Sequence, residues 1–452
     1  MMKRKKQFAE IVWILFSFVF LLLIAGIHLA FTVKRNGGIE DVLPKKPLTP
    51  IELPLSGPSV SFVTDSSNLI VDDKLSLSVI YDMLDSLRMG KDTILTIVHL
   101  GDSHLQAGYN SGRIMRLMHK DFGNVGRGWI SPLKLTKSNE PDDYFIHSEI
   151  KNWVSGRITQ SSPKCKVGPG GIGILSEALL INFDISITPN NGSGYWFNQA
   201  VLFRHPQAMP QSLVGSGDNT KTNTGSSELV PDLTTDTFRL PTLTDAIKLV
   251  SKANPVIPSD SILNLYYGFS LTNGNPGVLY HSVGVNGALF QNYTNESYIR
   301  QLAVLKPSLL IVSLGTNESF GRNFRKEVFN EQLDRFVTMV QTYMPQTTLL
   351  LTTPAECYKR TRVKKKRVYV RNDRTELVAQ TIVAYAREKG IACWDLFTIS
   401  GGKGSAKKWY KAGLFGRDRV HFTVTGYEEQ GTLFYRAFIQ NYNKSNKENV
   451  TR

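Results

Sequence analysis

The chain has 452 residues, of which 41% are hydrophobic and 10% aromatic, and its formal net charge is +15 at pH 7. This length and apolar content suffice for two or three domains with buried cores, which excludes an intrinsically disordered protein. The three cysteines, Cys165, Cys357 and Cys393, are too few and too widely spaced for a disulfide framework, so at most one bridge is expected.

The amino terminus predicts a membrane anchor. Residues 1–6 read MMKRKK, and Ile11–Val33 is an almost wholly apolar run of 23 residues. About 20 apolar residues cross a bilayer, whereas a cleaved signal peptide has an apolar run of about 7–15 residues and a small-x-small cleavage site. We therefore expect an uncleaved transmembrane signal anchor at residues 1–35, with its basic end in the cytoplasm and the rest of the chain outside. The proline-rich residues 36–58 predict a semi-extended linker.

Residues 59–131 predict the first part of an α/β domain. Apolar residues at helical spacing indicate a helix over Leu75–Leu87, and the apolar run Ile94–Leu100 indicates a buried strand. This strand stops abruptly at Gly-Asp-Ser-His, and an amphipathic helix is expected over Ser111–Phe122. A β-turn alone would explain such a corner, so its meaning depends on the rest of the chain.

Residues 132–276 have a different pattern. Short alternating or apolar runs, such as Ala178–Ile187 and Ile262–Leu271, are separated by stretches rich in Asn, Gly, Ser and Pro. This pattern predicts an inserted β-rich domain.

An α/β rhythm returns over residues 277–443, and residues 444–452 are expected to be a frayed tail. Strands are predicted at Leu309–Gly315, Thr348–Pro354 and Ile391–Phe397, with helices at Tyr298–Leu305, Glu327–Thr342 and Glu376–Lys389. Strands that alternate with helices predict a parallel sheet covered on both faces, and hence a three-layer α/β/α domain interrupted by the β-rich insertion.

Two glycine-rich stretches do not indicate nucleotide binding. Gly123–Gly128 follows a helix, and Gly168–Gly173 lacks a strand-to-helix context, so both are interpreted as loops and no P-loop is present. The eight histidines include no HExxH motif and no Cys/His cluster. No metal and no organic cofactor are therefore predicted.

The positive charge is concentrated in Lys359–Arg374, KRTRVKKKRVYVRNDR, which holds nine basic residues in sixteen. Outside the cytoplasm, an anionic polymer or lipid headgroups are better candidate partners for this run than nucleic acid. A solvated loop without a partner stays open.

Four corners of the α/β parts carry reactive or hydrogen-bonding groups. They are Ser103 after the first strand, Gly284 and Gly287 in VGVNGA, Asn317 in GTNE, and Asp418 with His421 in GRDRVHF. Ligands of doubly wound sheets bind beyond the carboxyl ends of the strands, where these corners would converge. A serine activated by a histidine that an aspartate orients, together with amide donors for an oxyanion, can transfer an acyl group to water.

The order GDS(H)…G…GxN…DxxH resembles that of the SGNH, or GDSL-type, hydrolases, a family of esterases, lipases and carbohydrate deacetylases with a flavodoxin-like fold. The resemblance implies that Ser103 is the nucleophile, His421 the base and Asp418 the residue that orients it. It also implies an oxyanion hole formed by the backbone N–H groups of Ser103 and Gly287 and the side chain of Asn317, with Gly284 a weaker alternative to Gly287.

The sequence departs from the family pattern at two positions, and neither departure removes one of these functional groups. His104 replaces the usual leucine of GDSL, and Glu318 follows Asn317 where aspartate is common. His104 could line the pocket or pack beneath it, and it is left out of the predicted catalytic set.

GDSHLQAGYNSGRIMRLM with FGNVGRGW, followed by a large β insertion, is similar to bacterial peptidoglycan O-acetylesterases of the Ape type. The resemblance implies that the insertion is a β-sandwich like a carbohydrate-binding module, and that the protein acts on the outer side of a bacterial inner membrane. Trp129 and Trp394 are expected in the core, whereas core and sugar-stacking roles stay open for Trp153 and Trp196.

The predicted function is therefore a membrane-anchored serine esterase that removes O-acetyl groups from a cell-wall or other extracytoplasmic polysaccharide through an acetyl-Ser103 intermediate. Three alternatives stay open, namely an O-acetyltransferase with the same site, a lipase or thioesterase, and a non-catalytic glycan-binding protein.

Overall fold

The computed structural model describes residues 48–55, 57, 63 and 68–450, except residues 179, 189–193, 216–220, 227–229, 252–262 and 322. The predicted anchor at residues 1–35 lies outside the described residues, as does much of the predicted linker. No helix in the part of the chain that the structure describes is long and apolar enough to cross a bilayer.

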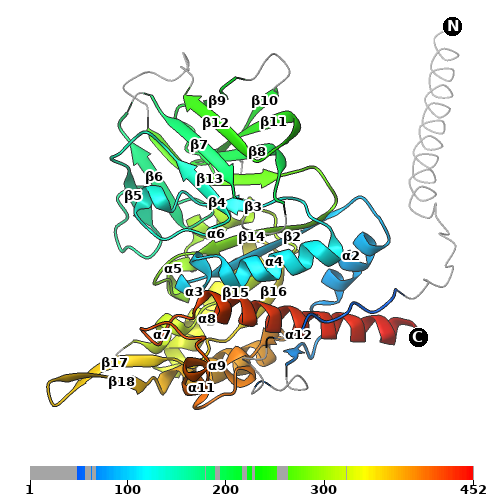
Figure 1. Ribbon diagram of the computed structural model, residues 1–452, viewed down its shortest axis with the longest axis vertical. Coiled ribbons are helices and arrows are strands. Elements are labelled where there is room, and N and C mark those ends of the chain that lie inside the picture. The colour runs from blue at the N-terminus through cyan, green and yellow to red at the C-terminus, as the bar shows by residue number, and fades with distance from the viewer. Residues whose placement is uncertain are drawn as a thin grey trace, which may run out of the picture. The chain divides into compact units, whose positions relative to one another are not determined.

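A six-stranded sheet with the order β1-β19-β16-β15-β2-β14 forms the centre of the α/β part (Figure 1). Its strands are β1 (Ile70–Val71), β2 (Ile94–Gly101), β14 (Gly277–Gly284), β15 (Leu309–Ser313), β16 (Thr348–Thr352) and β19 (Ala392–Trp394). All neighbours are parallel except β1 and β19. Counted along the chain, the parallel strands have the flavodoxin-like order 2-1-3-4-5, and the switch point lies between β2 and β15. The predicted parallel α/β sheet is confirmed, whereas the antiparallel edge strand β1 was not predicted because two residues show no period.

Both faces of this sheet are covered by helices. The central strands carry apolar side chains on both faces, and these are buried only where helices pack on each side. In β15, Leu309 and Ile311 belong to one core, and Leu310 and Val312 to the other. The first core contains residues of α2 (Ser78–Arg88), α4 (Tyr109–Phe122) and α12 (Val424–Val450). The second contains residues of α6 (Glu296–Ala303), α8 (Lys326–Tyr343) and α9 (Arg374–Lys389).

Short helices follow the carboxyl ends of the strands. They are α3 (Ser103–Gln106), α5 (Phe290–Tyr293), α7 (Thr316–Ser319), α10 (Leu396–Ile399) and α11 (Ser405–Lys411). The strand predicted over Ile391–Phe397 is shorter than expected, because a short helix begins within its predicted range. The side chain of Asp395 accepts a hydrogen bond from the backbone N–H of Thr398 at 3.3 Å, and this N-cap ends β19 by starting α10.

Two antiparallel sheets occupy the middle of the chain. One has the order β10-β11-β8-β13-β6-β5, with β3 also paired to β13, and the other has the order β4-β7-β12-β9. The strands are β3 (Gly128–Ile130), β4 (Tyr144–His147), β5 (Val154–Arg157), β6 (Ile172–Ser176), β7 (Asn182–Ile187), β8 (Phe197–Arg204), β9 (Gln211–Leu213), β10 (Lys221–Ser226), β11 (Thr234–Thr244), β12 (Ala246–Ser251) and β13 (Asn264–Thr272), and a 3-10 turn, η3, spans Lys134–Thr136. The boundaries predicted for the insertion, residues 132 and 276, stay a prediction.

Aromatic side chains join the two antiparallel sheets. Phe183 of β7 meets Tyr266 and Phe269 of β13 with ring centroids 5.1 and 5.6 Å apart, and Trp153 stacks on Phe183 at 5.8 Å. Trp153 is therefore a packing residue, whereas Trp196 is 56% exposed. The two tryptophans expected in the core, Trp129 and Trp394, are both buried.

Two segments differ from the sequence prediction. The tail predicted from residue 444 is part of α12, which continues to Val450 because residues 444–450 contain neither glycine nor proline to stop a helix. The basic run forms a hairpin of β17 (Tyr358–Val363) and β18 (Lys366–Arg371).

Candidate active site

Ser103 lies where β2 ends, next to the switch point of the sheet. A Cβ on Gly101 would lie 3.0 Å from the backbone oxygen of Ser313 on the neighbouring strand, so the corner needs a residue without a side chain. Asp102 then starts α3, because its Oδ1 accepts the backbone N–H of His104 at 2.9 Å. Ser103 is thus the first residue of a capped helix at the carboxyl edge.

His421 and Asp418 come from a turn before α12 and reach Ser103 across the chain. The Nε2 atom of His421 lies 2.8 Å from the Ser103 hydroxyl oxygen, and its Nδ1 atom lies 2.7 Å from Oδ2 of Asp418. Oδ1 of Asp418 accepts the backbone N–H groups of Val420 and His421, each at 3.0 Å. These distances fit a serine–histidine–aspartate relay, in which histidine takes the hydroxyl proton and aspartate fixes its orientation.

The aspartate of this relay is held in its charged form. Partial burial raises the pKa of Asp418, but the hydrogen bonds from the His421 ring and from the amides of Val420 and His421 outweigh burial and bring the pKa below its usual value. The side chains of His421 and Asp418 are 41% and 54% exposed, so this half of the site is open to solvent.

The two residues predicted for the oxyanion hole lie at neighbouring corners. Gly287 follows β14 in a turn with φ +79°, and a Cβ there would meet open space. Asn317 lies in α7, and its Nδ2 donates to Oδ2 of Asp102 at 3.1 Å and to the backbone oxygen of Ala288 at 3.0 Å. In this conformation Asn317 joins the nucleophile corner to the Gly287 turn, and the oxyanion roles of both residues stay predictions. At Gly284, a Cβ would lie 2.4 Å from the backbone nitrogen of Gln106, so this glycine serves close packing against α3.

Two residues that the sequence did not assign to the site hold these corners together. The amide of Gln106 accepts the backbone N–H of Asn286 at 2.8 Å and donates to Asn139 at 2.8 Å. The Tyr293 hydroxyl donates to the backbone oxygen of Gly101 at 2.7 Å. Neither carries a motif signal, because glutamine and tyrosine at these positions look like ordinary helix residues.

Two buried carboxyl groups, those of Asp102 and Glu318, lie near the Ser103 corner. Burial raises the pKa of Asp102 to about 7, although the His104 amide and the charge of His421 act in the opposite direction. Burial also raises the pKa of Glu318 to about 7, against the hydrogen bond from the Phe290 amide and together with the charge of Asp102. Oε1 of Glu318 accepts that amide at 2.7 Å. The departure from aspartate at residue 318 therefore supplies a longer side chain that reaches the start of α5.

His104, the departure from GDSL, packs against the proposed base. Its ring centroid lies 5.1 Å from that of His421, and its Nδ1 lies 3.0 Å from the Tyr427 hydroxyl. Burial, assisted by the charge of His421, lowers the pKa of His104 to about 3. The ring is therefore neutral near pH 7.

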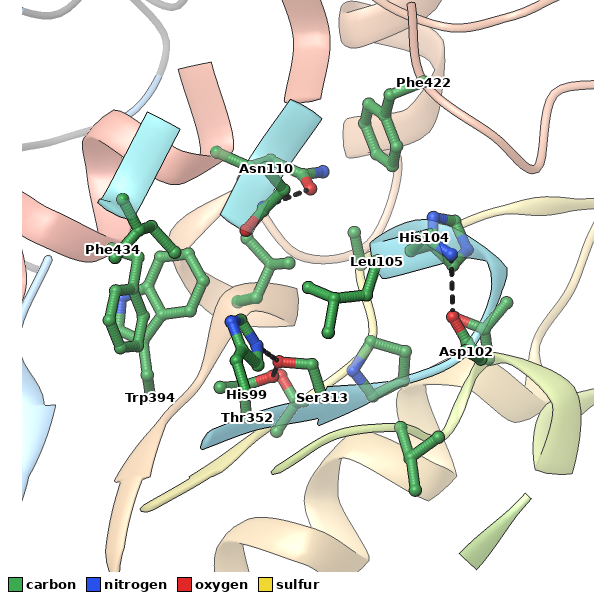
Figure 2. A pocket seen from close by; sticks show the side chains of 18 residues that line it. His99, Asp102, His104, Leu105, Asn110, Ser313, Thr352, Trp394, Phe422 and Phe434 are labelled. Atoms are coloured by element: carbon green, nitrogen blue, oxygen red, sulfur yellow. Dashed lines mark hydrogen bonds between the residues drawn. The ribbon is translucent and has the colours of Figure 1, made fainter. Parts of the chain in front are cut away.

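A small cavity of about 50 Å³ lies under the nucleophile corner (Figure 2). Figure 2 shows His99, Ser313 and Thr352 at one end of this cavity and Asp102 and His104 at the other, with Leu105 between them. His99 is fixed by Ser313 and Tyr280, each at 2.7 Å, and burial lowers its pKa to about 3. Neither Ser103 nor His421 lines this cavity. It therefore lies behind the Ser103 corner and is not the substrate cleft.

The described residues show neither a metal cluster nor a bridge between cysteines. No group of three or more His, Cys, Asp or Glu side chains among them is arranged to hold a metal ion. The described thiols of Cys165, Cys357 and Cys393 are free.

Comparison with known proteins agrees with this geometry. Residues 263–429 match the model of the GDSL-like lipase/acylhydrolase family, a segment that contains Gly287, Asn317, Asp418 and His421. No curated protein matches the chain. Together with the structural match described next, the family match confirms the predicted resemblance to GDSL-type hydrolases.

The structure of a peptidoglycan O-acetylesterase matches with a TM-score of 0.65 and 19% identity, over 84% of this chain and 99% of that chain. At this identity, the likeness shows a shared fold. A lipase/acylhydrolase from Enterococcus faecalis matches with a TM-score of 0.27 and 18% identity, over 37% of this chain and 77% of that chain. A GDSL-like lipase from Bacteroides thetaiotaomicron matches with a TM-score of 0.25 and 15% identity, over 37% of this chain and 76% of that chain.

Proposed function

We propose that the chain, an esterase that resembles the GDSL-like lipase/acylhydrolase family, removes O-acetyl groups from an extracytoplasmic polysaccharide. Peptidoglycan is the first candidate. The observation that carries this proposal is the relay from Ser103 through His421 to Asp418, with contacts of 2.8 and 2.7 Å at the carboxyl edge of the sheet.

In the proposed reaction, Nε2 of His421 takes the proton of the Ser103 hydroxyl while Oγ attacks the acetyl carbonyl carbon. Asp418 stabilises the imidazolium that forms. The tetrahedral intermediate collapses when its C–O bond to the sugar breaks and His421 gives the proton to the leaving oxygen. Water then attacks the acetyl-Ser103 ester while His421 takes its proton. The bond between the acetyl carbon and Oγ of Ser103 breaks, His421 returns the proton to Oγ, and acetate leaves.

The oxyanion of the tetrahedral intermediate needs donors in fixed positions. The backbone N–H groups of Ser103 and Gly287 and one Nδ2 hydrogen of Asn317 are proposed for this role. Asn317 would exchange its bond to Asp102 or to Ala288 for the oxyanion. A single such donor commonly contributes a factor of about 10²–10³ to the rate.

The proposed substrate class is supported by two features. The fold matches a peptidoglycan O-acetylesterase over 84% of this chain. A match of this extent includes most of the antiparallel sheets as well as the α/β part. The exposed half-site at His421 and Asp418 can accept a group carried on a polymer, because these side chains are 41% and 54% exposed.

The location is also proposed. Residues 1–35 would anchor the protein in a bacterial inner membrane, with the catalytic domain on the periplasmic or outer side. Protease added to intact spheroplasts should then degrade the catalytic domain, whereas protection from protease until lysis would contradict this orientation.

The proposed function is tested with the full-length chain in detergent, beside Ser103→Ala and the matched control Ser161→Ala, an exposed serine far along the chain from the relay. Acetate release from an aryl acetate and from O-acetylated peptidoglycan should fall by about 10⁴-fold or more in Ser103→Ala only. Release from the aryl acetate alone would keep the esterase and reject this polymer. Release that requires an added sugar acceptor would favour an acetyltransferase.

A further inference from the structure

The hairpin of β17 and β18 projects from the α/β part near the carboxyl edge of the sheet, in yellow at the lower left of Figure 1. It follows β16 and is not part of the six-stranded sheet. Its base is held by Arg371, which forms ion pairs with Glu356, Asp373 and Glu376. The hairpin is therefore an attached, ordered element of the fold.

The outer half of this hairpin carries a dense positive charge. Six exposed cations occupy it, and none takes part in an ion pair found among the described residues. They are Arg360, Arg362, Lys364, Lys365, Lys366 and Arg367. We call these six residues the hairpin cations. Their charges are free to attract an anion from solution.

The hairpin keeps these cations against its local conformational preferences. Lys364 and Lys365 form the two-residue turn with φ of +47° and +65°, a conformation in which Asn and Gly are favoured. Arg362 lies directly opposite Arg367 on the paired strand, and like charges in this position repel. Local choices that oppose stability are typical of functional sites.

Arg419 connects the hairpin to the catalytic turn. Its guanidinium lies over the rings of Tyr358 and Tyr369, at 5.5 and 4.7 Å from their centroids, and over Tyr410 of α11 at 4.4 Å. Its backbone oxygen accepts the N–H of Tyr358 at 2.9 Å. Arg419 directly follows Asp418, so the base of the hairpin lies beside the relay.

We propose that the hairpin cations bind carboxylates of the polymer that carries the ester, and that the hairpin thereby presents the polymer to Ser103. This inference rests on the proposed function and adds the chemistry of its substrate, a glycan with carboxylate side groups. A chain of spaced carboxylates matches a strip of unpaired cations beside an exposed site.

The aromatic rings of the hairpin argue against nucleic acid as the occupant. Bases bound in single strands stack on free aromatic faces. Here the rings of Tyr358, Tyr369 and Tyr410 already hold Arg419. A membrane surface is also less suited, since Val363 is the one large apolar side chain of the hairpin that is mostly exposed, at 51%.

The test variant removes charge without weakening the hairpin. It combines Lys364→Asn and Lys365→Gly, which suit the turn, with Arg362→Thr and Arg367→Thr, which replace a repelling pair by one with high strand propensity. The matched control neutralises four exposed lysines on other elements, Lys91→Gln, Lys120→Gln, Lys151→Gln and Lys164→Gln, and so changes the net charge equally.

With O-acetylated peptidoglycan as substrate, we expect KM to rise about tenfold in the hairpin variant and less than about twofold in the control. The turnover of a neutral aryl acetate should stay within about twofold of wild type in both. An equal KM in the two variants would overturn the inference, even where wild-type hydrolysis of the polymer supports the proposed function.

Binding is measured separately from hydrolysis, so that each proposal fails on its own. Ser103→Ala protein is sedimented with peptidoglycan, with peptidoglycan whose carboxyl groups have been converted to amides, and with vesicles of equal parts phosphatidylcholine and phosphatidylglycerol. We expect binding to peptidoglycan and not to the amidated polymer, and loss of this binding in the hairpin variant. Vesicle binding through residues 1–35 should be equal with and without the hairpin substitutions. Undiminished binding to the amidated polymer, or charge-dependent binding only to vesicles or to an added single-stranded DNA, would overturn the inference.

Discussion

The two halves of the candidate site are built in opposite ways. On the nucleophile side, Asp102 and Glu318 are buried at 1% and 7% exposure, and the pKa of each is raised to about 7 by burial. On the base side, Asp418 and His421 are about half exposed, and the pKa of Asp418 is lowered by hydrogen bonds. The comparison shows that Ser103 is positioned by packing, whereas His421, the proposed base, is positioned by a short polar turn.

This difference has a physical reason. The nucleophile corner is enclosed by neighbouring strands and short helices, so its carboxyl groups lose water and become weak acids. The turn before α12 is covered on fewer sides, so water and amide donors keep Asp418 ionised. The protein thus holds aspartates of opposite character around one serine.

The largest effect is expected on the exposed side of the site, at Asp418. Asp418→Asn keeps the shape of the turn but removes the charge that stabilises the His421 imidazolium and its tautomer, so kcat for the aryl acetate should fall by about 10²–10⁴-fold. Steady-state kinetics measure this loss. The matched control is Asp245→Asn, an exposed aspartate in the antiparallel part, which should behave as wild type. Equal activity of the two variants would show that Asp418 does not act in the relay.

A smaller effect, on the free energy of unfolding, is expected on the buried side of the site, at Glu318. The pKa of glutamate is about 4.3 in an unfolded chain, and burial raises that of Glu318 to about 7. Because folding raises this pKa, the stability contribution of the protonated acid is fully present below about pH 4 and is lost as the pH rises through about 7. Glu318→Gln mimics the protonated acid and should raise the free energy of unfolding by about 1–3 kcal/mol at pH 8, and hardly at pH 4.

Chemical denaturation at the two pH values measures this difference. Glu356→Gln is the comparison variant, since that buried carboxylate accepts the backbone N–H groups of Gly404 and Ala406 and not that of Phe290. A gain for Glu318→Gln that is the same at both pH values would contradict the burial argument.

The smallest effect is expected where the two halves touch, at His104. His104→Leu restores the residue common in the family but leaves the buried Tyr427 hydroxyl without its partner, which should cost about 1 kcal/mol of unfolding free energy. Adding Tyr427→Phe should recover most of this loss, because both partners are then apolar. Thermal unfolding of the two single variants and the double variant provides the measurement. A loss that the second change leaves untouched would place the cost in packing against His421 instead.

Sequence patterns predicted much of the α/β framework. Gly287, Asn317, Asp418 and His421 were predicted as site residues from short motifs in a fixed order, and their roles stay predictions. The alternating burial of Leu309–Val312 explains why the central strands appear in the sequence as apolar runs. The basic hairpin also had a strand signal in Val363, Val368 and Val370. The hairpin was not predicted, because Lys364 and Lys365 occupy the two turn positions at which Asn-Gly is the usual sequence signal of a hairpin.

By itself, the sequence determined the properties that depend on neighbours along the chain. These are the apolar strands, the helices between them, and the polar corners where strands end, because periodicity and turn chemistry act over a few residues. Tertiary structure alone decided which distant groups meet. It placed His421 2.8 Å from a serine 318 positions earlier, directed Asn317 toward Asp102, and joined the hairpin to the turn of Asp418 and His421 through Arg419. Burial and contact set these properties, and both depend on how remote segments pack together.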